Sequence, residues 1–340
     1  MNMKEIRNVA RENMKGFCRV CPVCNGVACA GEVPGMGGSL TGSAFKSNVE
    51  DLKQVKLRLK TIHDAKNPDL GFDFFGTKLN NPIISAPITG SAFNMGGALT
   101  EEEYIDSVVN GSLAAGTIAM IGDSADPELY DLGLGALREV DGKGVAILKP
   151  KANSVVIESL KKAEAINSIA AGMDIDGAGL ITMALKGAAV SPKTIEELKE
   201  IISSTTLPFI LKGIMTKEEA LLAVEVGAKA IVVSNHGGRV LDHAESTAKV
   251  LPEIVEAVKG KIMILVDGGI RSGIDVFKMI ALGADAALIG RPVIFGAFGG
   301  HKEGVSLIIE EMHNQLLQAM ILTGAKDLAS IDKSMISIEW

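Results

Sequence analysis

The sequence predicts an α/β fold, a (β/α)₈ barrel that follows an N-terminal extension containing cysteines. From Asn81 onward, eight short apolar runs alternate with amphipathic stretches of helical pattern. The runs are continuously apolar, as a parallel sheet buried on both faces requires. The span from Asn81 to the end of the chain is also close to the ~250 residues typical of such barrels. A doubly wound open sheet is the alternative that shares this pattern.

The strands are expected at the eight apolar runs, which are residues 82–86, 116–121, 144–148, 169–175, 208–212, 230–234, 263–267 and 286–289. One helix is expected to begin after Thr100, which is followed by three glutamates, and another after Asp126, which is followed by Pro127. Thr216 and Glu219 have the spacing of a capping box. The other helices are expected at 153–166, 192–203, 216–225, 247–258, 273–282 and 303–322.

The chain divides by pattern into residues 1–80, an extension with a cysteine cluster and a lead-in helix, and residues 81–340, the barrel. Within the extension, residues 33–48 are rich in glycine and serine and are expected to form a loop. Residues 49–67 alternate charged and apolar residues and are expected to lead into the barrel as helix or strand.

Composition excludes several functional classes. Of 340 residues, 47% are hydrophobic and 4% aromatic, and the net charge is −7. An acidic chain with few aromatics is a poor match for nucleic acid or an anionic membrane, which both require a basic face. No apolar run approaches the ~18 residues of a membrane span, and the N-terminus lacks the apolar core of a signal peptide. We therefore expect a cytoplasmic protein that acts on a small molecule.

Charged residues follow four successive strands, at the end of a barrel where function resides. Lys212 ends the fifth strand, and His236 and Arg239 follow the sixth. Glycine-rich turns follow the seventh and eighth strands, and each leads into a helix whose N-terminus can bind phosphate. The arginines beside these turns, Arg271 and Arg291, would add charge-assisted hydrogen bonds.

The loop after the sixth strand carries the clearest chemical signal. The loop holds His236, and a histidine side chain is suited to proton transfer in enzymes, while Arg239 can bind a carboxylate through two parallel hydrogen bonds. A base beside a carboxylate-binding group favours a substrate whose carboxylate adjoins the reacting carbon. Lys212 would need a buried anion or a site where negative charge develops, and an ion pair with Asp267 is the structural alternative.

The segments LKGI (211–214), SNHGGRVLD (234–242) and VDGGIRSGIDVFKMIALGADAALIGRP (266–292) together resemble the FMN-dependent α-hydroxy-acid oxidising family. This family includes glycolate oxidase, lactate oxidase and flavocytochrome-type lactate dehydrogenases. The similarity is strong from about residue 207 to 292 and weaker elsewhere in the barrel. It implies a TIM barrel with FMN across its mouth, an oxidoreductase activity on α-hydroxy acids, and a homo-oligomer, often a tetramer.

The resemblance also implies a role for each matching residue. His236 would take a proton from the substrate, Arg239 would hold the substrate carboxylate, and Lys212 would stabilise the reduced flavin. Asp267 would pair with the histidine and belongs with His236 and Lys212 in the expected catalytic set. The residues expected to bind the cofactor are Ala86, Pro87, Ile88, Ser124, Lys212, Ser234, Gly237, Asp267, Gly268, Gly269, Arg271, Gly290 and Arg291.

The chain departs from the family on the substrate side. The family has tyrosines that touch the substrate, but here Tyr104 and Tyr130 are the only tyrosines and both fall in expected helices. Lys149 occupies about the position of one of them and is our candidate for a substrate contact. No second arginine follows the fourth strand, and the loop there is shortened to roughly fifteen residues.

Cys18, Cys21, Cys24 and Cys29 are the only cysteines in the chain. Their spacing, C-x₂-C-x₂-C-x₄-C, is similar to a ferredoxin-type motif except for its last gap and the position of its proline. An iron–sulfur cluster, a zinc site, redox-active thiols and simple packing all remain open, with iron–sulfur ahead of zinc. A cluster would offer electrons a route out of the flavin and would make oxygen a less expected acceptor.

The sequence thus favours an FMN-dependent enzyme that oxidises a 2-hydroxy acid to the keto acid and passes the electrons to an acceptor the sequence does not identify. Two alternatives remain at this stage. One is an FMN barrel oxidoreductase with a different substrate. The other is a non-catalytic flavin-binding barrel with a metal-bound regulatory segment.

Overall fold

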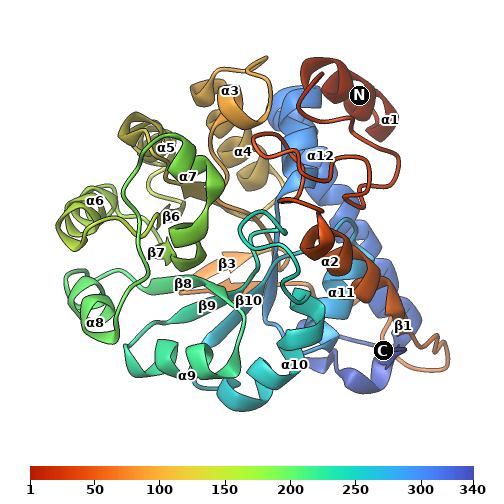
Figure 1. Cartoon of the computed structure of the whole chain (residues 1–340). Coiled ribbons are helices and arrows are strands. Elements are labelled where there is room, and N and C mark those ends of the chain that lie inside the picture. The colour runs from red at the N-terminus through yellow and green to blue at the C-terminus, as the bar shows by residue number, and fades with distance from the viewer.

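Eight parallel strands close into a barrel in the computed structural model, which describes all residues 1–340 (Figure 1). The hydrogen-bonded order runs from β4 to β11 in sequence, and β11 closes the barrel by pairing with β4. The barrel strands are β4 (Ile83–Ser85), β5 (Ala119–Gly122), β6 (Gly144–Leu148), β7 (Ala170–Asp174), β8 (Phe209–Ile214), β9 (Ala230–Val233), β10 (Met263–Val266) and β11 (Ala286–Ile289). Each expected strand is present, so the barrel prediction is confirmed and the open sheet is excluded.

The alternation of side chains along each strand produces two cores. Side chains such as Met120, Val145 and Leu265 form a compact inner cluster. This cluster also includes Phe74 and Leu79 from the antiparallel hairpin of β2 (Phe72–Phe74) and β3 (Thr77–Leu79), which lies just before β4 in the chain. The hairpin therefore closes the amino-terminal end of the barrel. A larger outer cluster packs the strands against the surrounding helices, which leaves only the carboxyl-terminal end for a site.

The helices that alternate with the barrel strands are α3 (Ser91–Asn94), α4 (Glu101–Ala114), α5 (Pro127–Glu139), α6 (Asn153–Ala165), α7 (Ile181–Leu185), α8 (Ile195–Ser203), α9 (Lys217–Glu225), α10 (Thr247–Val258), α11 (Gly273–Ala281) and α12 (Arg291–Thr323). Thr100 forms a full capping box with Glu103, and Thr216 accepts a hydrogen bond from the Glu219 backbone N–H. Helix α12 is broken at Gly300 and His301, so the expected helix 303–322 is its second part. Its first part begins at Arg291, just after β11, where the glycine-rich turn was expected to lead into a helix, although the expected bounds covered only residues 303–322. No helix combines the length and the apolar character that crossing a bilayer would require.

Short 3₁₀ turns complete the regular structure, at η1 (Ile175–Gly179), η2 (Leu328–Ser330) and η3 (Lys333–Met335). The turn η1 and helix α7 lie between β7 and α8, so the loop after the fourth barrel strand runs from 175 to 194 and is longer than expected.

The N-terminal extension packs against the barrel at several places. Helix α1 (Met3–Asn13) packs against α12, and α2 (Ser43–Gln54) packs against α10. Strand β1 (Val55–Leu57) pairs with β12 (Ile336–Ile338) near the other end of the chain. The expected loop 33–48 is only partly correct, because residues 43–48 are helical. The division at residue 80 remains a prediction, and in Figure 1 the red and orange extension lies along the barrel.

Candidate active site

A cavity occupies the carboxyl-terminal end of the barrel. Its empty volume, including the solvent at its open mouth, is about 1150 Å³. Its lining includes Lys212 within β8 and residues that follow β4, β5, β6, β7, β9, β10 and β11, and these include nearly all of the residues expected from the sequence. The expected residues that line it are Ala86, Pro87, Ile88, Ser124, Lys149, Lys212, His236, Gly237, Arg239, Asp267, Gly268, Gly269, Arg271, Gly290 and Arg291. Ser234 is the exception, because it is fully buried and its hydroxyl accepts a hydrogen bond from the His236 backbone N–H at 3.1 Å.

The loop after β9 holds His236 in an unusual backbone conformation. His236, Gly237 and Gly238 all have positive φ, at 58°, 62° and 77°. A β-carbon on Gly238 would come within 2.3 Å of the Phe45 backbone nitrogen, so only glycine fits there. Asn235 accepts a hydrogen bond from the Gly238 backbone N–H at 3.2 Å. The surrounding contacts therefore over-determine a strained conformation, as is common at functional sites.

Asp174, at the end of β7, is the centre of a buried ion-pair network. Its carboxylate accepts hydrogen bonds from the ammonium groups of Lys149 at 2.6 Å and Lys212 at 2.8 Å. All three side chains are at most 8% exposed. Burial by itself raises the pKa of Asp174, but the charges of His236, Lys149 and Lys212 outweigh burial and lower the pKa well below its usual range. Asp174 is therefore ionised at neutral pH and forms ion pairs with both lysines.

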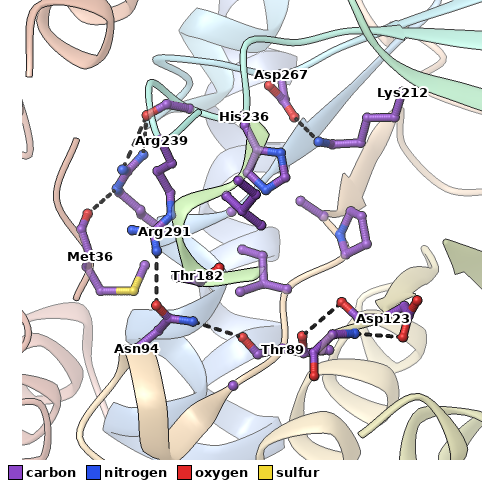
Figure 2. A pocket seen from close by; sticks show the side chains of 18 of the residues that line it. Met36, Thr89, Asn94, Asp123, Thr182, Lys212, His236, Arg239, Asp267 and Arg291 are labelled. Atoms are coloured by element: carbon purple, nitrogen blue, oxygen red, sulfur yellow. Dashed lines mark hydrogen bonds and ion pairs between the residues drawn. The ribbon is translucent and has the colours of Figure 1, made fainter. Parts of the chain in front are cut away.

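The carboxylates that face His236 lie at the end of β7 and just after it, whereas the expected partner, Asp267, follows β10. The His236 Nδ1 lies 3.0 Å from Asp176 Oδ1 and 3.6 Å from Asp174 Oδ1. The expectation that Asp267 pairs with His236 is wrong, since Asp267 makes its ion pair with Lys212 at 3.8 Å (Figure 2). A carboxylate facing Nδ1 favours the tautomer whose proton is on Nδ1, which leaves Nε2 free to accept a proton. The signal that could have found Asp174 and Asp176 was their position immediately at the end of a barrel strand.

Asp267 lines the cavity with an unsatisfied oxygen. Its Oδ1 is buried and has no hydrogen-bond partner in the protein. Burial raises the pKa of Asp267, although the Lys212 charge opposes this effect. A buried carboxylate oxygen without a partner is costly, which indicates that a bound group or a proton satisfies it.

Arg239 has only neutral hydrogen-bond partners. Its guanidinium donates hydrogen bonds to the carbonyl of Gly35 and to the carbonyl of Gly37 at 3.1 Å. It also donates to the side-chain oxygen of Asn94 at 3.0 Å (Figure 2). Burial and the neighbouring Arg291 lower the pKa of Arg239. A guanidinium with no carboxylate partner, in a site with excess positive charge, favours a bound anion.

The turns after β10 and β11 have the donors that a phosphate group requires. The backbone N–H groups of Gly268, Gly269 and Ile270 donate no hydrogen bond within the protein. One Arg271 nitrogen is also buried without a partner. Arg291 donates to the carbonyl of Met36 at 2.9 Å, and its guanidinium lies 3.7 Å from the centre of the Phe45 ring. These unpaired donors fit the phosphate of FMN.

Residues from three other segments complete the cavity, and the sequence did not reveal them. Met36 comes from the extension, Phe93 and Asn94 come from α3, and Lys186 follows α7. Its ammonium lies 4.7 Å from the centre of the Phe93 ring. Tyr104 and Tyr130 are buried in α4 and α5, the helices in which they were expected, and neither lines the cavity. The expected substrate contact Lys149 does line the cavity, but its ammonium is held by Asp174.

The four cysteines lie outside the cavity, in the segment between α1 and α2. All four are free thiols, and no three of their sulfur atoms lie within 4.8 Å of one another. The one trio of potential ligands at that spacing is Asp174, Asp176 and His236. Two ammonium groups already neutralise Asp174, which disfavours a metal ion there.

One mouth of the closed parallel barrel carries a phosphate-binding turn, a buried lysine and a histidine–carboxylate pair. It also carries an arginine that has no carboxylate partner. Together these features define the class of FMN-binding barrel oxidoreductases. The model of one family, FMN-dependent dehydrogenase, matches residues 36–182 and 131–338. The chain therefore belongs to the FMN-dependent α-hydroxy-acid oxidase and dehydrogenase family, as its motifs indicated.

Individual relatives agree with this assignment. The chain is 32% identical to an L-lactate oxidase of Nostoc sp., over 90% of this chain and 92% of the relative. It is 30% identical to a peroxisomal (S)-2-hydroxyacid oxidase of Arabidopsis thaliana, over 89% and 90% of the two chains. A crystal structure of mandelate oxidase superposes with a TM-score of 0.79 at 28% identity and covers 99% of this chain and 97% of the other.

Proposed function

We propose that this protein binds FMN across the barrel mouth and oxidises an (S)-2-hydroxy acid to the corresponding 2-keto acid. The observation that carries the proposal is that a base with a free nitrogen and a carboxylate-binding cation, His236 and Arg239, line the same cavity. The unpaired phosphate donors of the turn after β10 support the cofactor, and the family supports the substrate class. A non-catalytic flavin-binding barrel would not need the His236–Asp176 pair.

The residues of the chain divide the work. Arg239 binds the substrate carboxylate and presents the adjacent carbon to the cavity. His236 accepts a proton from the substrate at Nε2, and the imidazolium that results is stabilised by Asp176 at 3.0 Å and by Asp174 at 3.6 Å. FMN, when bound, would supply the acceptor for the electron pair and for the second hydrogen that the substrate loses. Lys212 is positioned by Asp174 and brings a positive charge to the cavity, where it would stabilise the negative charge of the reduced cofactor.

Anaerobic reduction of the flavin tests this function. The purified protein, loaded with FMN, is mixed without oxygen with a panel of glycolate, L-lactate, longer aliphatic 2-hydroxy acids and (S)-mandelate. We expect at least one to bleach the flavin absorption with saturable kinetics and to yield one keto acid per flavin. Failure of FMN to bind would reject the cofactor, and bleaching by none of the panel would favour a different substrate.

Replacing Arg239 with lysine is expected to weaken 2-hydroxy-acid binding by roughly 10–200-fold, because one charge-assisted hydrogen bond of about 1.5–3 kcal/mol is lost with the planar fork. The concentration for half-maximal bleaching measures this effect. Arg138→Lys on the exposed surface of α5 is the matched control and is expected to leave the value unchanged. An unchanged value in Arg239→Lys would contradict the assigned role.

A further inference from the structure

The segment between α1 and α2 carries four cysteines that no step of the proposed function uses. It contains almost no regular structure, yet polar contacts hold it against the rest of the protein. Arg271 donates a hydrogen bond to the Cys24 carbonyl at 3.2 Å, and the Arg7 guanidinium contacts the carbonyl of Cys21. The Ser39 backbone N–H donates to the Gly238 carbonyl at 2.9 Å. The four thiols are therefore presented by a fixed backbone.

The four thiols lie close enough to influence one another. The pKa of Cys18 is raised to about 11, mainly by burial, and the nearby Cys24 and Cys29 act in the same direction. Burial also raises the pKa of Cys29, to which Cys24 and Cys21 both contribute. The four thiols are therefore neighbours in space as well as in sequence.

Packing against the hydrophobic core does not explain all four cysteines. Cys18 and Cys24 pack against the large outer core, whereas Cys21 and Cys29 are not among the residues packed on it. Each of the four is partly exposed, and none is bonded to another. Four unpaired thiols gathered in one short segment, with no other cysteine in the chain, indicate a ligand set.

The spacing of the sulfur atoms distinguishes between metals. Tetrahedral zinc with bonds of about 2.3 Å brings its four sulfur ligands to roughly 3.8 Å from one another. Here no three of the sulfurs lie within 4.8 Å. A four-iron cube binds each cysteine at a different corner and therefore holds its ligands farther apart. The first two gaps of the motif, each of two residues, match those of ferredoxin-type sites.

The charges around the segment complement such a cluster. Arg271 and Arg291 make no ion pair with any carboxylate of the protein, and Cys24, Cys29 and Cys18 are the groups whose negative charge would most favour the Arg291 cation. A four-iron cluster with four thiolate ligands carries net negative charge. The arginines that face the phosphate site from one side would therefore stabilise the cluster from the other.

We propose that Cys18, Cys21, Cys24 and Cys29 bind a four-iron, four-sulfide cluster beside the mouth of the barrel. The chain after Cys29 includes the carbonyls of Gly35, Met36 and Gly37. These carbonyls accept hydrogen bonds from Arg239 and Arg291. Cluster binding would therefore further stabilise the segment that contacts these two arginines. This inference does not depend on which substrate the enzyme oxidises.

Iron and acid-labile sulfide assays test the site directly. The full-length protein is purified without oxygen and reconstituted with ferrous iron and sulfide, and we expect about four of each per chain. After dithionite reduction at low temperature, we expect the electron paramagnetic resonance signal of a reduced four-iron cluster, which flavin absorption does not obscure. Zinc in place of iron, or no bound metal, would overturn the proposal.

Two variants make the assignment specific to the cysteines. Cys24→Ser is expected to lose most of the iron, the sulfide and the signal. Val27→Ser, whose side chain lies 59% exposed on the same segment, is the matched control and is expected to keep them. A thermal melt and the FMN content of Cys24→Ser show whether the barrel is still folded. Equal iron in both variants and the unchanged protein would exclude these cysteines as ligands.

Discussion

Replacing His236 with asparagine is expected to slow the reduction of bound flavin by a 2-hydroxy acid about 10²–10⁴-fold, the usual contribution of a positioned general base. Asparagine keeps a polar group near Asp176 but has no nitrogen that can accept the proton. FMN binding should persist, because the phosphate donors belong to the turn after β10. Stopped-flow absorbance under anaerobic conditions measures the rate, and fluorescence titration measures FMN affinity.

His243→Asn is the matched control for this variant. His243 lies in the same loop after β9 and also has positive φ, at 60°, but its side chain is 73% exposed and lies outside the cavity. It should reduce flavin at the unchanged rate. A loss of less than tenfold in His236→Asn, or an equal loss in the two variants, would show that His236 is not the base.

Replacing Asp174 with asparagine is expected to lower the free energy of unfolding by about 3–5 kcal/mol, because two buried ammonium groups lose their counter-ion. Lys149 and Lys212 are 8% and 4% exposed, so water replaces little of the lost interaction. Urea denaturation followed by circular dichroism measures the change. Asp131→Asn removes a Lys162 ion pair of similar length, 2.8 Å, whose partners are 45% and 51% exposed, and should cost at most about 1 kcal/mol.

The pH dependence of the Asp174 effect has a defined direction. The pKa of Asp174 is lowered in the folded protein, so the stability it contributes is fully present above the ordinary aspartate range. It is lost only as the pH falls through the depressed folded value. The difference between the unchanged protein and Asp174→Asn should therefore persist at neutral and mildly acidic pH and shrink only in strong acid. A difference that already disappears near pH 5 would contradict an ionised Asp174.

The strands and most of the cavity could be predicted because they depend on local sequence. A strand buried on both faces must be continuously apolar, and its polar residues can appear only where it ends. Lys212, His236 and Asp267 were therefore recognisable from the sequence as residues of the barrel mouth. The turn glycines are also local requirements, since positive φ at Gly268 and Gly269 favours glycine whatever surrounds them.

The partners of those residues could not be read in the same way. Asp174, Asp176 and Asp267 all follow barrel strands, and the sequence does not state which one faces the histidine. The segment between the expected strand 169–175 and the expected helix 192–203 was predicted to be a shortened loop. It contains η1 and α7, and it brings Thr182, Met183 and Lys186 to the cavity. These contacts depend on how neighbouring strands are staggered and on how a loop packs.

The sequence by itself determined the barrel, the rim on which the chemistry lies and the family, because hydrophobic periodicity and strand-end residues are properties of short segments. The tertiary structure alone decided that His236 pairs with Asp176, that Asp174 forms ion pairs with two lysines, and that residues 35–37 of the extension hold Arg239 and Arg291. The physical reason is that ion pairs and hydrogen bonds form between groups within about 3 Å in space. Chain segments as much as 255 residues apart are brought to that distance only by the closed barrel.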